Sequence, residues 1–262
     1  MDLQLAGKKV LVTGSTAGIG FAAALEFAAE GASVVINGRT QERVDRAVAE
    51  IRKQHRGAQV SGVASDVSNA AGCAKLVEAV PQVDVLVNNM GIFEPKPFEQ
   101  IPDADWLRLF EANVLSGVRL SRHYLGGMRG RNWGRIIFVS SESAVQIPTE
   151  MIHYGMTKTA QVAVARGIAE SVAGTGITVN SVLAGPTRSE GVETFIAQMG
   201  AAGDSAAFEA EFFKNIRPTS LIKRFETTDE VAHMIVYLCS PLASGTTGAA
   251  VRVDGGVVRA IL

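Results

Sequence analysis

The chain has 262 residues and a formal net charge of −1, with 47% hydrophobic and 19% charged residues. This length suits one large α/β domain or two small ones, and the composition excludes a largely disordered chain. A balanced charge without a long basic run argues against nucleic acid or an anionic membrane surface as a main partner. A small-molecule ligand is therefore expected.

Cys73 and Cys239 are the only cysteines, too few for a disulfide framework, and neither stands in metal-ligand spacing. No metal site is predicted. The amino terminus lacks a basic region followed by an apolar stretch and a cleavage site, and no apolar run is long enough to span a bilayer. We expect a cytoplasmic protein that does not enter a membrane.

Short apolar runs rich in β-branched residues predict seven strands. These are Lys8–Thr13, Ser33–Asn37, Gln59–Ala64, Asp84–Val87, Arg135–Ser140, Thr178–Leu183 and Ala249–Val253. Helical spacing separates them, first in Ile19–Glu30 and then in Gln41–Gln54. Continuous rather than alternating apolar strands indicate burial on both faces, hence a parallel sheet. The prediction is a single doubly wound, Rossmann-like α/β domain over residues 1–262.

A glycine-rich turn, Thr13–Gly20, follows the first strand and opens the first helix. Glycines let a backbone turn tightly and approach a pyrophosphate, which the amide groups and the positive end of the helix dipole stabilise. The spacing G-x-x-x-G-x-G differs from the commoner G-x-G-x-x-G, but the position after a strand and before a helix is the one that a dinucleotide fingerprint requires.

The end of the second strand reads Ile36-Asn37-Gly38-Arg39. An acidic residue there would bind the adenosine ribose hydroxyls, whereas an arginine attracts a 2′-phosphate. Arg39 therefore favours NADP(H). The glycine turn itself carries no basic residue that could pair with a 2′-phosphate, because Ala17 stands inside it, so NAD(H) stays open as the second choice.

Tyr154 and Lys158 are four residues apart, which places them on one face of a helix. A nearby ammonium group favours the phenolate and so can lower the pKa of a tyrosine. Ser141 lies thirteen residues before Tyr154, at the end of an apolar strand. Glu142 is expected on the opposite face of the chain from Ser141, and His153 at a helix edge.

The region from Gly185 to Thr227 interrupts the alternation of strands and helices. It contains a small-residue patch, Gly200–Ser205, and the aromatic residues Phe208, Phe212 and Phe213. A long connection within a compact domain is often functional, so we interpret residues 185–227 as a substrate lid, with a subunit-packing element as the alternative.

Together with Asn88-Asn89-Met90-Gly91, Asn113 and Val253-Asp254-Gly255-Gly256, these motifs resemble the short-chain dehydrogenase/reductase family over nearly the whole chain. The chain is most similar to its carbonyl reductases of roughly 250 residues, such as the 3-oxoacyl thioester reductases. Two departures are Met90, where the family usually has alanine, and Ala184-Gly185-Pro186-Thr187, where it usually has Pro-Gly.

The resemblance implies a catalytic set of Asn113, Ser141, Tyr154 and Lys158. Tyr154 would be the acid/base that exchanges a proton with the substrate oxygen, and Ser141 would donate a hydrogen bond to that oxygen. Lys158 would lower the pKa of Tyr154 and bind the nicotinamide ribose, and Asn113 would hold a water of the proton relay. The implied cofactor contacts are Gly14, Ser15, Thr16, Gly18, Ile19, Gly20, Arg39, Asp66, Val67, Asn89, Gly91, Tyr154, Lys158, Gly185, Thr187 and Ser189.

The implied reaction is the NAD(P)(H)-dependent interconversion of a ketone and a secondary alcohol. Phe93, Glu94, residues 143–147, Met151 and His153 are expected to line a mostly apolar substrate pocket. Alternatives are an isomerase or dehydratase that uses the cofactor transiently, and a non-catalytic redox sensor. An enoyl reductase would space its tyrosine and lysine seven apart, and the residue seven after Tyr154 is Gln161.

The helix that begins near His153 continues through Ala160–Ala169, which is apolar on most of its circumference. Such a helix needs more packing surface than one domain face offers, and in similar proteins it pairs between subunits. A homotetramer is predicted, with a dimer as the second choice.

Overall fold

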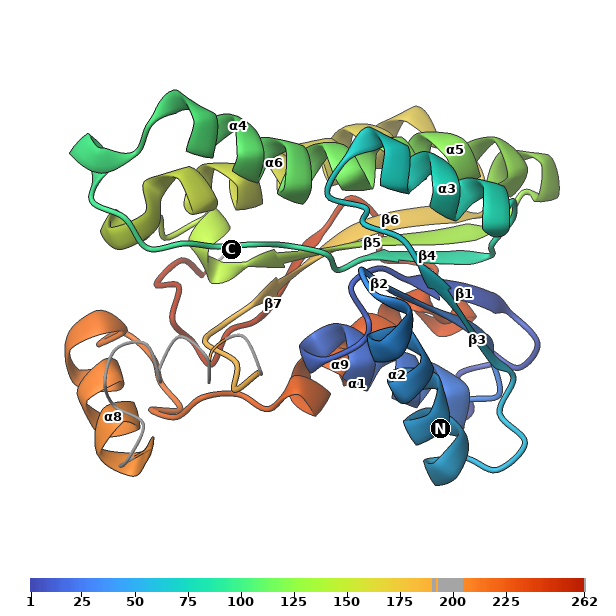
Figure 1. The fold of residues 1–262 in the computed structure, drawn as a ribbon, viewed down its shortest axis with the longest axis horizontal. Coiled ribbons are helices and arrows are strands. Elements are labelled where there is room, and N and C mark those ends of the chain that lie inside the picture. The colour runs from blue at the N-terminus through green and yellow to red at the C-terminus, as the bar shows by residue number, and fades with distance from the viewer. Residues whose placement is uncertain (190–191, 193–204, 262) are drawn as a thin grey trace.

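Seven parallel strands form one sheet in the computed structural model of the protein, which describes residues 1–189, 192 and 205–261 (Figure 1). The strands are β1 (Lys9–Val12), β2 (Ser33–Gly38), β3 (Val60–Ala64), β4 (Val85–Asn88), β5 (Gly134–Ser141), β6 (Ile177–Ala184) and β7 (Ala250–Val253). All seven predicted strands are present, and no strand end differs from its prediction by more than one residue.

The sheet order is β3-β2-β1-β4-β5-β6-β7, and every pair of neighbouring strands is parallel. The chain moves outward in one direction through β1, β2 and β3, and then crosses back to place β4 on the other side of β1. Ligands of such folds bind at the carboxyl ends of the strands where the order reverses. The loops after β1 and β4 therefore define where a site is expected.

Helices cover both faces of the sheet, which confirms the doubly wound fold (Figure 1). One face carries α1 (Gly18–Ala29), α2 (Gln41–Gln54) and α9 (Thr228–Cys239); the other carries α3 (Ala70–Ala79), α5 (Ser116–Arg131) and α6 (Ile152–Ser171), with α4 (Asp103–Phe110) against α6. Two apolar cores result. Leu11, Val35 and Leu86 point to one of them, whereas Val10, Val34 and Val85 point to the other.

Local sequence explains where several helices begin. The Thr40 hydroxyl accepts from Arg43 N at 3.4 Å at the start of α2. Helix α9 has a complete capping box, in which Thr227 and Glu230 each satisfy the other's backbone amide. Such caps replace hydrogen bonds that the first turn of a helix lacks.

A π-helical turn, Glu111–Leu115, joins α4 to α5. Its hydrogen bond runs from Ser116 N to the carbonyl oxygen of Glu111, five residues earlier. The wider turn was not predicted. It changes the direction in which Asn113, at its centre, presents its side chain.

Between β6 and α9, the described part of the predicted lid contains helix α8 (Ser205–Glu211) and a second π-helical turn, Phe212–Ile216. Figure 1 shows α8 away from the sheet, beyond the carboxyl ends of the strands. Four aromatic rings pack together here, with centroid distances of 4.9 to 6.1 Å. Phe212 contacts Phe208, Phe213 and Phe225, and Phe213 also contacts Phe225. Residues 200–204 of the predicted small-residue patch lie outside the described residues.

Among the described residues, no helix is both long and apolar enough to cross a membrane. Cys73 in α3 and Cys239 in α9 are both free thiols and both buried.

Candidate active site

The turn between β1 and α1 contains two glycines in the left-handed region, Gly14 at φ 60° and Gly18 at φ 59°. A residue with a Cβ is strained there, so the backbone itself requires glycine. Helix α1 begins at Gly18 without a side-chain cap and without an acidic residue in its first turn. The unpaired amide groups and the positive end of the helix dipole make this turn suitable for an anion.

Asn89, after β4, supports the glycine turn from the side. Its Nδ2 donates to the carbonyl oxygens of Thr13 at 2.9 Å and of Gly14 at 3.1 Å. A Cβ on Gly20 would lie 2.4 Å from the same nitrogen and 2.7 Å from the Gly14 carbonyl oxygen. The turn therefore presents bare backbone, which fits the pyrophosphate of a dinucleotide.

Ser15 uses its polar groups within the protein. Its hydroxyl donates to the Val12 carbonyl oxygen at 2.7 Å and accepts from Asn37 N at 3.0 Å, and its own amide donates to the Asn37 carbonyl oxygen at 2.9 Å. Ser15 thus has no free donor for a ligand. The remaining donors of the turn lie in the segment Thr16–Gly20 and are the better candidates for a phosphate.

The end of β2 carries no carboxylate. Asn37 is buried, and its side-chain amide donates to two carbonyl oxygens of the β3 segment at 3.2 and 3.1 Å. A Cβ on Gly38 would lie 2.4 Å from Cγ2 of Thr16. Arg39 follows directly after β2 and is exposed.

The predicted adenine contacts follow β3. Asp66 is exposed, and its carboxylate accepts from Ser68 N at 3.1 Å. The Val67 side chain is 2% exposed and packs in the core, while its carbonyl oxygen accepts from the Cys73 thiol at 3.4 Å. A contact from Val67 to a ligand would therefore involve its backbone.

Asn113 is held between the β4 loop and α6. Its Oδ1 accepts from Ile92 N at 2.7 Å, and its Nδ2 donates to the Ile92 carbonyl oxygen at 2.9 Å and to Thr157 Oγ1 at 3.0 Å. The Asn113 carbonyl oxygen accepts from Gln161 Nε2 at 2.6 Å. A Cβ on Gly91 would lie 3.4 Å from Lys158 Nζ and 3.7 Å from Asn113 Oδ1, so these three positions meet.

Tyr154 and Lys158 lie near the start of α6, one turn apart, with Lys158 Nζ 5.5 Å from the centroid of the Tyr154 ring. Lys158 is buried, and its ammonium group donates to the Val139 carbonyl oxygen at 3.0 Å. Ser141, at the end of β5, lies close enough to Tyr154 to influence the pKa of its phenol. The structure thus brings together all four residues of the predicted catalytic set.

Burial raises the pKa of Tyr154, and the negative charge of Glu142 raises it further. The hydrogen bond with Ser141 and the positive charge of Arg217 act in the opposite direction. Burial also lowers the pKa of Lys158 to about 8, against the attraction of Glu142. The expectation that Lys158 makes this phenol acidic is therefore not met here, because burial dominates and the ammonium group is directed to Val139.

The prediction that Glu142 faces away from Ser141 is wrong. The Ser141 hydroxyl donates to Oε2 of Glu142, and Ser143 donates to the same oxygen through its amide at 2.6 Å and its hydroxyl at 2.9 Å. The chain leaves the strand at this point and forms the 3₁₀ turn Glu142–Ala144, so the alternation of strand side chains no longer applies.

The other oxygen of that carboxylate, Glu142 Oε1, accepts from Arg217 Nε at 2.8 Å. Both side chains of the pair are less than one tenth exposed. Arg217 also donates to Glu150 Oε1 at 3.1 Å. The sequence contains no spacing that would have predicted the Arg217 contact; the one available signal was a charged residue, Glu142, directly after a fully buried strand.

The residues after β6 are held by a buried carboxyl group. Glu226 Oε2 accepts from Gly185 N at 3.1 Å, and Thr187 Oγ1 donates to the Gly185 carbonyl oxygen at 3.0 Å. Ser189 lies against the glycine turn, since a Cβ on Gly18 would be 3.5 Å from Ser189 Cβ. Glu226, which sequence reasoning missed, thus holds the chain at Gly185 and Thr187, one of the two predicted carboxamide contacts.

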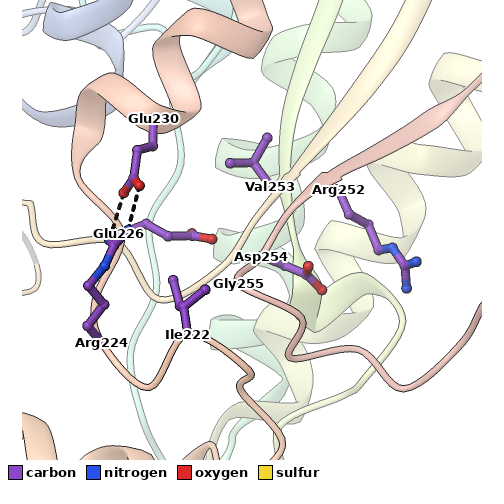
Figure 2. Close-up of a pocket in the computed structure, with 8 residues that line it drawn as sticks. All are labelled: Ile222, Arg224, Glu226, Glu230, Arg252, Val253, Asp254 and Gly255. Atoms are coloured by element: carbon purple, nitrogen blue, oxygen red, sulfur yellow. Dashed lines mark hydrogen bonds and ion pairs between the residues drawn. The ribbon is translucent and has the colours of Figure 1, made fainter.

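A cavity of about 280 Å³ adjoins this carboxyl group (Figure 2). It is lined by Ile222, Arg224, Glu226, Glu230, Arg252, Val253, Asp254 and Gly255. Arg224 and Glu230 pair across its side at 2.7 Å. Burial, together with the neighbouring Asp254, raises the pKa of Glu226 to about 8.

The expected substrate pocket is only partly as predicted. Phe93 packs edge-on against Tyr154 with ring centroids 6.0 Å apart, and Val145 and Ile147 are exposed apolar residues near Ser141. His153 is fully buried and packs against Trp106 at 5.8 Å. It is not exposed at a helix edge and does not line an open pocket.

Among the described residues, no group of acidic, histidine and cysteine side chains could hold a metal ion.

Comparison with known proteins gives whole-chain similarities. Residues 14–258 match the family model described as Enoyl-(Acyl carrier protein) reductase. The oxidoreductase YvaG of Bacillus subtilis is 48% identical over 100% of both chains, and the 3-oxoacyl-[acyl-carrier-protein] reductase FabG of Aquifex aeolicus is 31% identical over 98% of this chain and 100% of its own. The crystal structure of L-sorbose reductase from Gluconobacter frateurii, complexed with NADPH and L-sorbose, has a TM-score of 0.93 at 31% identity over 100% of both chains.

Proposed function

Because the chain belongs to the short-chain dehydrogenase/reductase family of oxidoreductases, we propose that it interconverts a ketone and a secondary alcohol, with NADP(H) as cofactor and Tyr154 as the acid/base. The observation that carries the proposal is the convergence of Ser141, Tyr154, Lys158 and Asn113 at the carboxyl ends of β4 and β5. A protein that only bound the cofactor would have no need of this set.

When bound, a reduced nicotinamide supplies the hydride that adds to the carbonyl carbon. Tyr154 donates its hydroxyl proton to the carbonyl oxygen, so that ketone, hydride and proton together give the alcohol. Ser141 stabilises the negative charge that develops on that oxygen. Lys158, held by Val139, places a positive charge beside the phenolate that remains. In the reverse direction Tyr154 accepts the proton.

The residues that would hold the dinucleotide are those of the glycine turn, with Asp66 and Val67 beside the adenine and Thr187 or Ser189 beside the nicotinamide carboxamide. The exposed Arg39 and the absence of a carboxylate at the end of β2 support NADP(H) over NAD(H). The complex of L-sorbose reductase with NADPH supports this choice, since that protein has a similar structure.

For the substrate we propose a medium-sized carbonyl compound. The names of similar proteins suggest two classes to examine, 3-oxoacyl thioesters and keto sugars. Residues 185–227 are proposed to cover the substrate, since the described part of this segment supplies Arg217 to the site. We propose further that the protein acts in the cytoplasm as a homotetramer, with a dimer as the alternative.

The test follows the oxidation of NADPH and of NADH by absorbance, across ketones, keto sugars, 3-oxoacyl thioesters and enoyl thioesters. Tyr154→Phe is the matched blank. We expect turnover of one carbonyl class with NADPH, and loss of at least about a hundredfold in the variant, because general acid catalysis is worth that much. Cofactor affinity should stay within a few-fold, since the variant removes one hydroxyl and leaves the glycine turn unchanged.

Retained turnover in Tyr154→Phe would reject the acid/base assignment. Reduction of the enoyl thioester alone would replace carbonyl reduction with C=C reduction. NADPH binding without turnover of any compound would favour the redox sensor, and redox-neutral conversion of an alcohol substrate would favour an isomerase or dehydratase.

A further inference from the structure

A buried ion pair contacts the proposed catalytic serine, although neither of its members belongs to the proposed catalytic set. Arg217 and Glu142 are 2.8 Å apart, with side chains 8% and 5% exposed. Removing two charges from water costs free energy that their attraction does not always return, so such a pair is weak evidence for a role in stability alone. Its position beside Ser141 suggests a different role.

The carboxylate of Glu142 determines where the Ser141 proton points. An ionised carboxylate only accepts hydrogen bonds, so the contact between Ser141 Oγ and Glu142 Oε2 must be donated by the serine. Ser143 N donates to the Ser141 oxygen at 3.1 Å. The Ser141 proton is therefore held by Glu142, and the hydroxyl must turn from that carboxylate to donate to the substrate oxygen.

The arginine is fixed as firmly as the carboxylate. The amide of Arg217 donates to the Phe212 carbonyl oxygen, five residues earlier, at 3.0 Å, which closes the second π-helical turn. Its guanidinium donates to Glu142, to Glu150 and to the Ile216 carbonyl oxygen. The chain beyond α8 is thus linked to the proposed catalytic serine through the Arg217 guanidinium and the Glu142 carboxylate.

The charged groups around Tyr154 come from four elements. Glu142 follows β5, Glu150 precedes α6, Lys158 lies in α6, and Arg217 follows the second π-helical turn. Glu142 and Arg217 act on the phenol with opposite signs. The two charges therefore oppose one another at the phenol, and removal of one leaves the remaining charge uncompensated.

We propose that Glu142 and Arg217 are a pair of positioning residues for the reaction proposed above: Glu142 orients the Ser141 hydroxyl, and Arg217 neutralises Glu142 so that Tyr154 can lose its proton. The inference rests on the proposed function for its catalytic meaning. The electrostatic effect of the pair can be measured without turnover, since ionisation of the Tyr154 phenol changes its ultraviolet absorbance.

The experiment titrates the Tyr154 phenolate in the full-length protein, with and without NADP⁺, as the absorbance difference from the same protein carrying Tyr154→Phe. The variants are Glu142→Gln, Arg217→Met and the double variant. Glu142→Gln removes a negative charge and should lower the midpoint by about one pH unit; Arg217→Met should raise it by about one unit, which is the usual size for a close charge. The double variant should lie between them.

The pH dependence of alcohol oxidation is the second readout. Oxidation needs the phenolate, so the rise in kcat with pH should move to lower pH in Glu142→Gln and to higher pH in Arg217→Met. Glu50→Gln and Lys53→Met are the controls, since they remove the same charges from an exposed pair on α2. Neither should move the titration. Arg217→Lys, which keeps the charge, should restore most of the wild-type midpoint.

Shifts of the same sign, or unshifted midpoints in variants that bind NADPH, would overturn the inference while wild-type turnover left the proposed function intact. Opposite shifts in a protein without turnover would reject the proposed function and leave the electrostatic role standing. If Arg217→Met does not fold, Glu142→Gln and the double variant provide the test. Phenol titration midpoints identical to that of the wild type in both would refute the proposed roles of Glu142 and Arg217.

Discussion

Arg39 lies at the end of β2, the position from which folds of this kind reach the adenosine ribose. The residues before it make their contacts elsewhere and do not bind its side chain. Asn37 forms hydrogen bonds with Ser15 in the turn after β1 and with two carbonyl oxygens of the β3 segment, and Gly38 packs against Thr16. No carboxylate at this edge of β2 opposes a 2′-phosphate. In the proposed function, the preference for NADP(H) over NAD(H) therefore depends on this one exposed guanidinium group.

We predict that Arg39→Ala weakens NADPH binding by roughly ten- to a hundredfold, as expected for a lost charge-assisted hydrogen bond, and leaves NADH binding within about twofold. Isothermal titration calorimetry measures both. Arg56→Ala, which removes an exposed arginine beyond α2, is the matched control. Equal losses for the two nucleotides would show that Arg39 does not read the phosphate.

Sequence reasoning placed Ser141, Tyr154 and Lys158 close together, as the structure does, because Ser141 ends a strand and the other two are one helical turn apart. It missed Glu142 because the chain changes from strand to 3₁₀ turn within a single peptide, and side-chain direction there depends on that change. Arg217 was missed for another reason. Its contact with Glu142 spans 75 residues, and no local periodicity encodes such a distance.

At the scale of elements, all seven strands were predictable because a strand buried on both faces is a continuous apolar run bounded by polar residues. The π-helical turns were not. Each π-helical turn adds one residue to a turn of helix, and tertiary contacts determine where it forms. In the first, Asn113 is hydrogen-bonded to Ile92 in the loop after β4 and to Thr157 in α6. The loop after β6 likewise depends on Glu226, from the segment before α9.

Glu226 should make the stability of the protein depend on pH. Its pKa is raised from 4.5 to about 8 in the fold, so the native state keeps a proton that the unfolded chain loses first. The free energy of unfolding should therefore fall as the pH rises from about 4.5 to about 8. The loss should be on the order of a few kcal/mol.

In Glu226→Gln this slope should be absent, which urea denaturation at several pH values would show. Buried Lys158 affects the free energy of unfolding in a different pH range. Its pKa is lowered from 10.5 to about 8, so it makes stability rise with pH only between about 8 and 10.5. Glu78→Gln, on the exposed face of α3, serves as the control. A slope equal to that of the wild type would exclude Glu226 as its source.

At the scale of the whole molecule, α6 leaves one face uncovered. Thr159, Ala163 and Gly167 are exposed and lie at intervals of four residues, so they form one stripe of small side chains. A Cβ on Gly167 would meet nothing within 4 Å. A second helix can approach such a stripe closely, which supports the predicted assembly.

Light scattering after gel filtration should give four times the chain mass of 27.6 kDa, or twice that mass if the dimer is the stable form. Ala163→Glu should produce a smaller species, because it places a charge in the proposed interface. Ala49→Glu, on an exposed position of α2, should leave the mass unchanged. A wild-type monomer at micromolar concentration would contradict the assembly.

The two buried thiols give the molecule a reporter on each side of its sheet. Cys239 lies in the core beneath α1 and α9, and Cys73 in the core beneath α3 and α5. Burial raises the pKa of both thiols, so each reacts with a thiol reagent only when its own helical layer opens. The labelling rates of the two cysteines therefore distinguish a protein whose layers open independently from one that opens as a single unit.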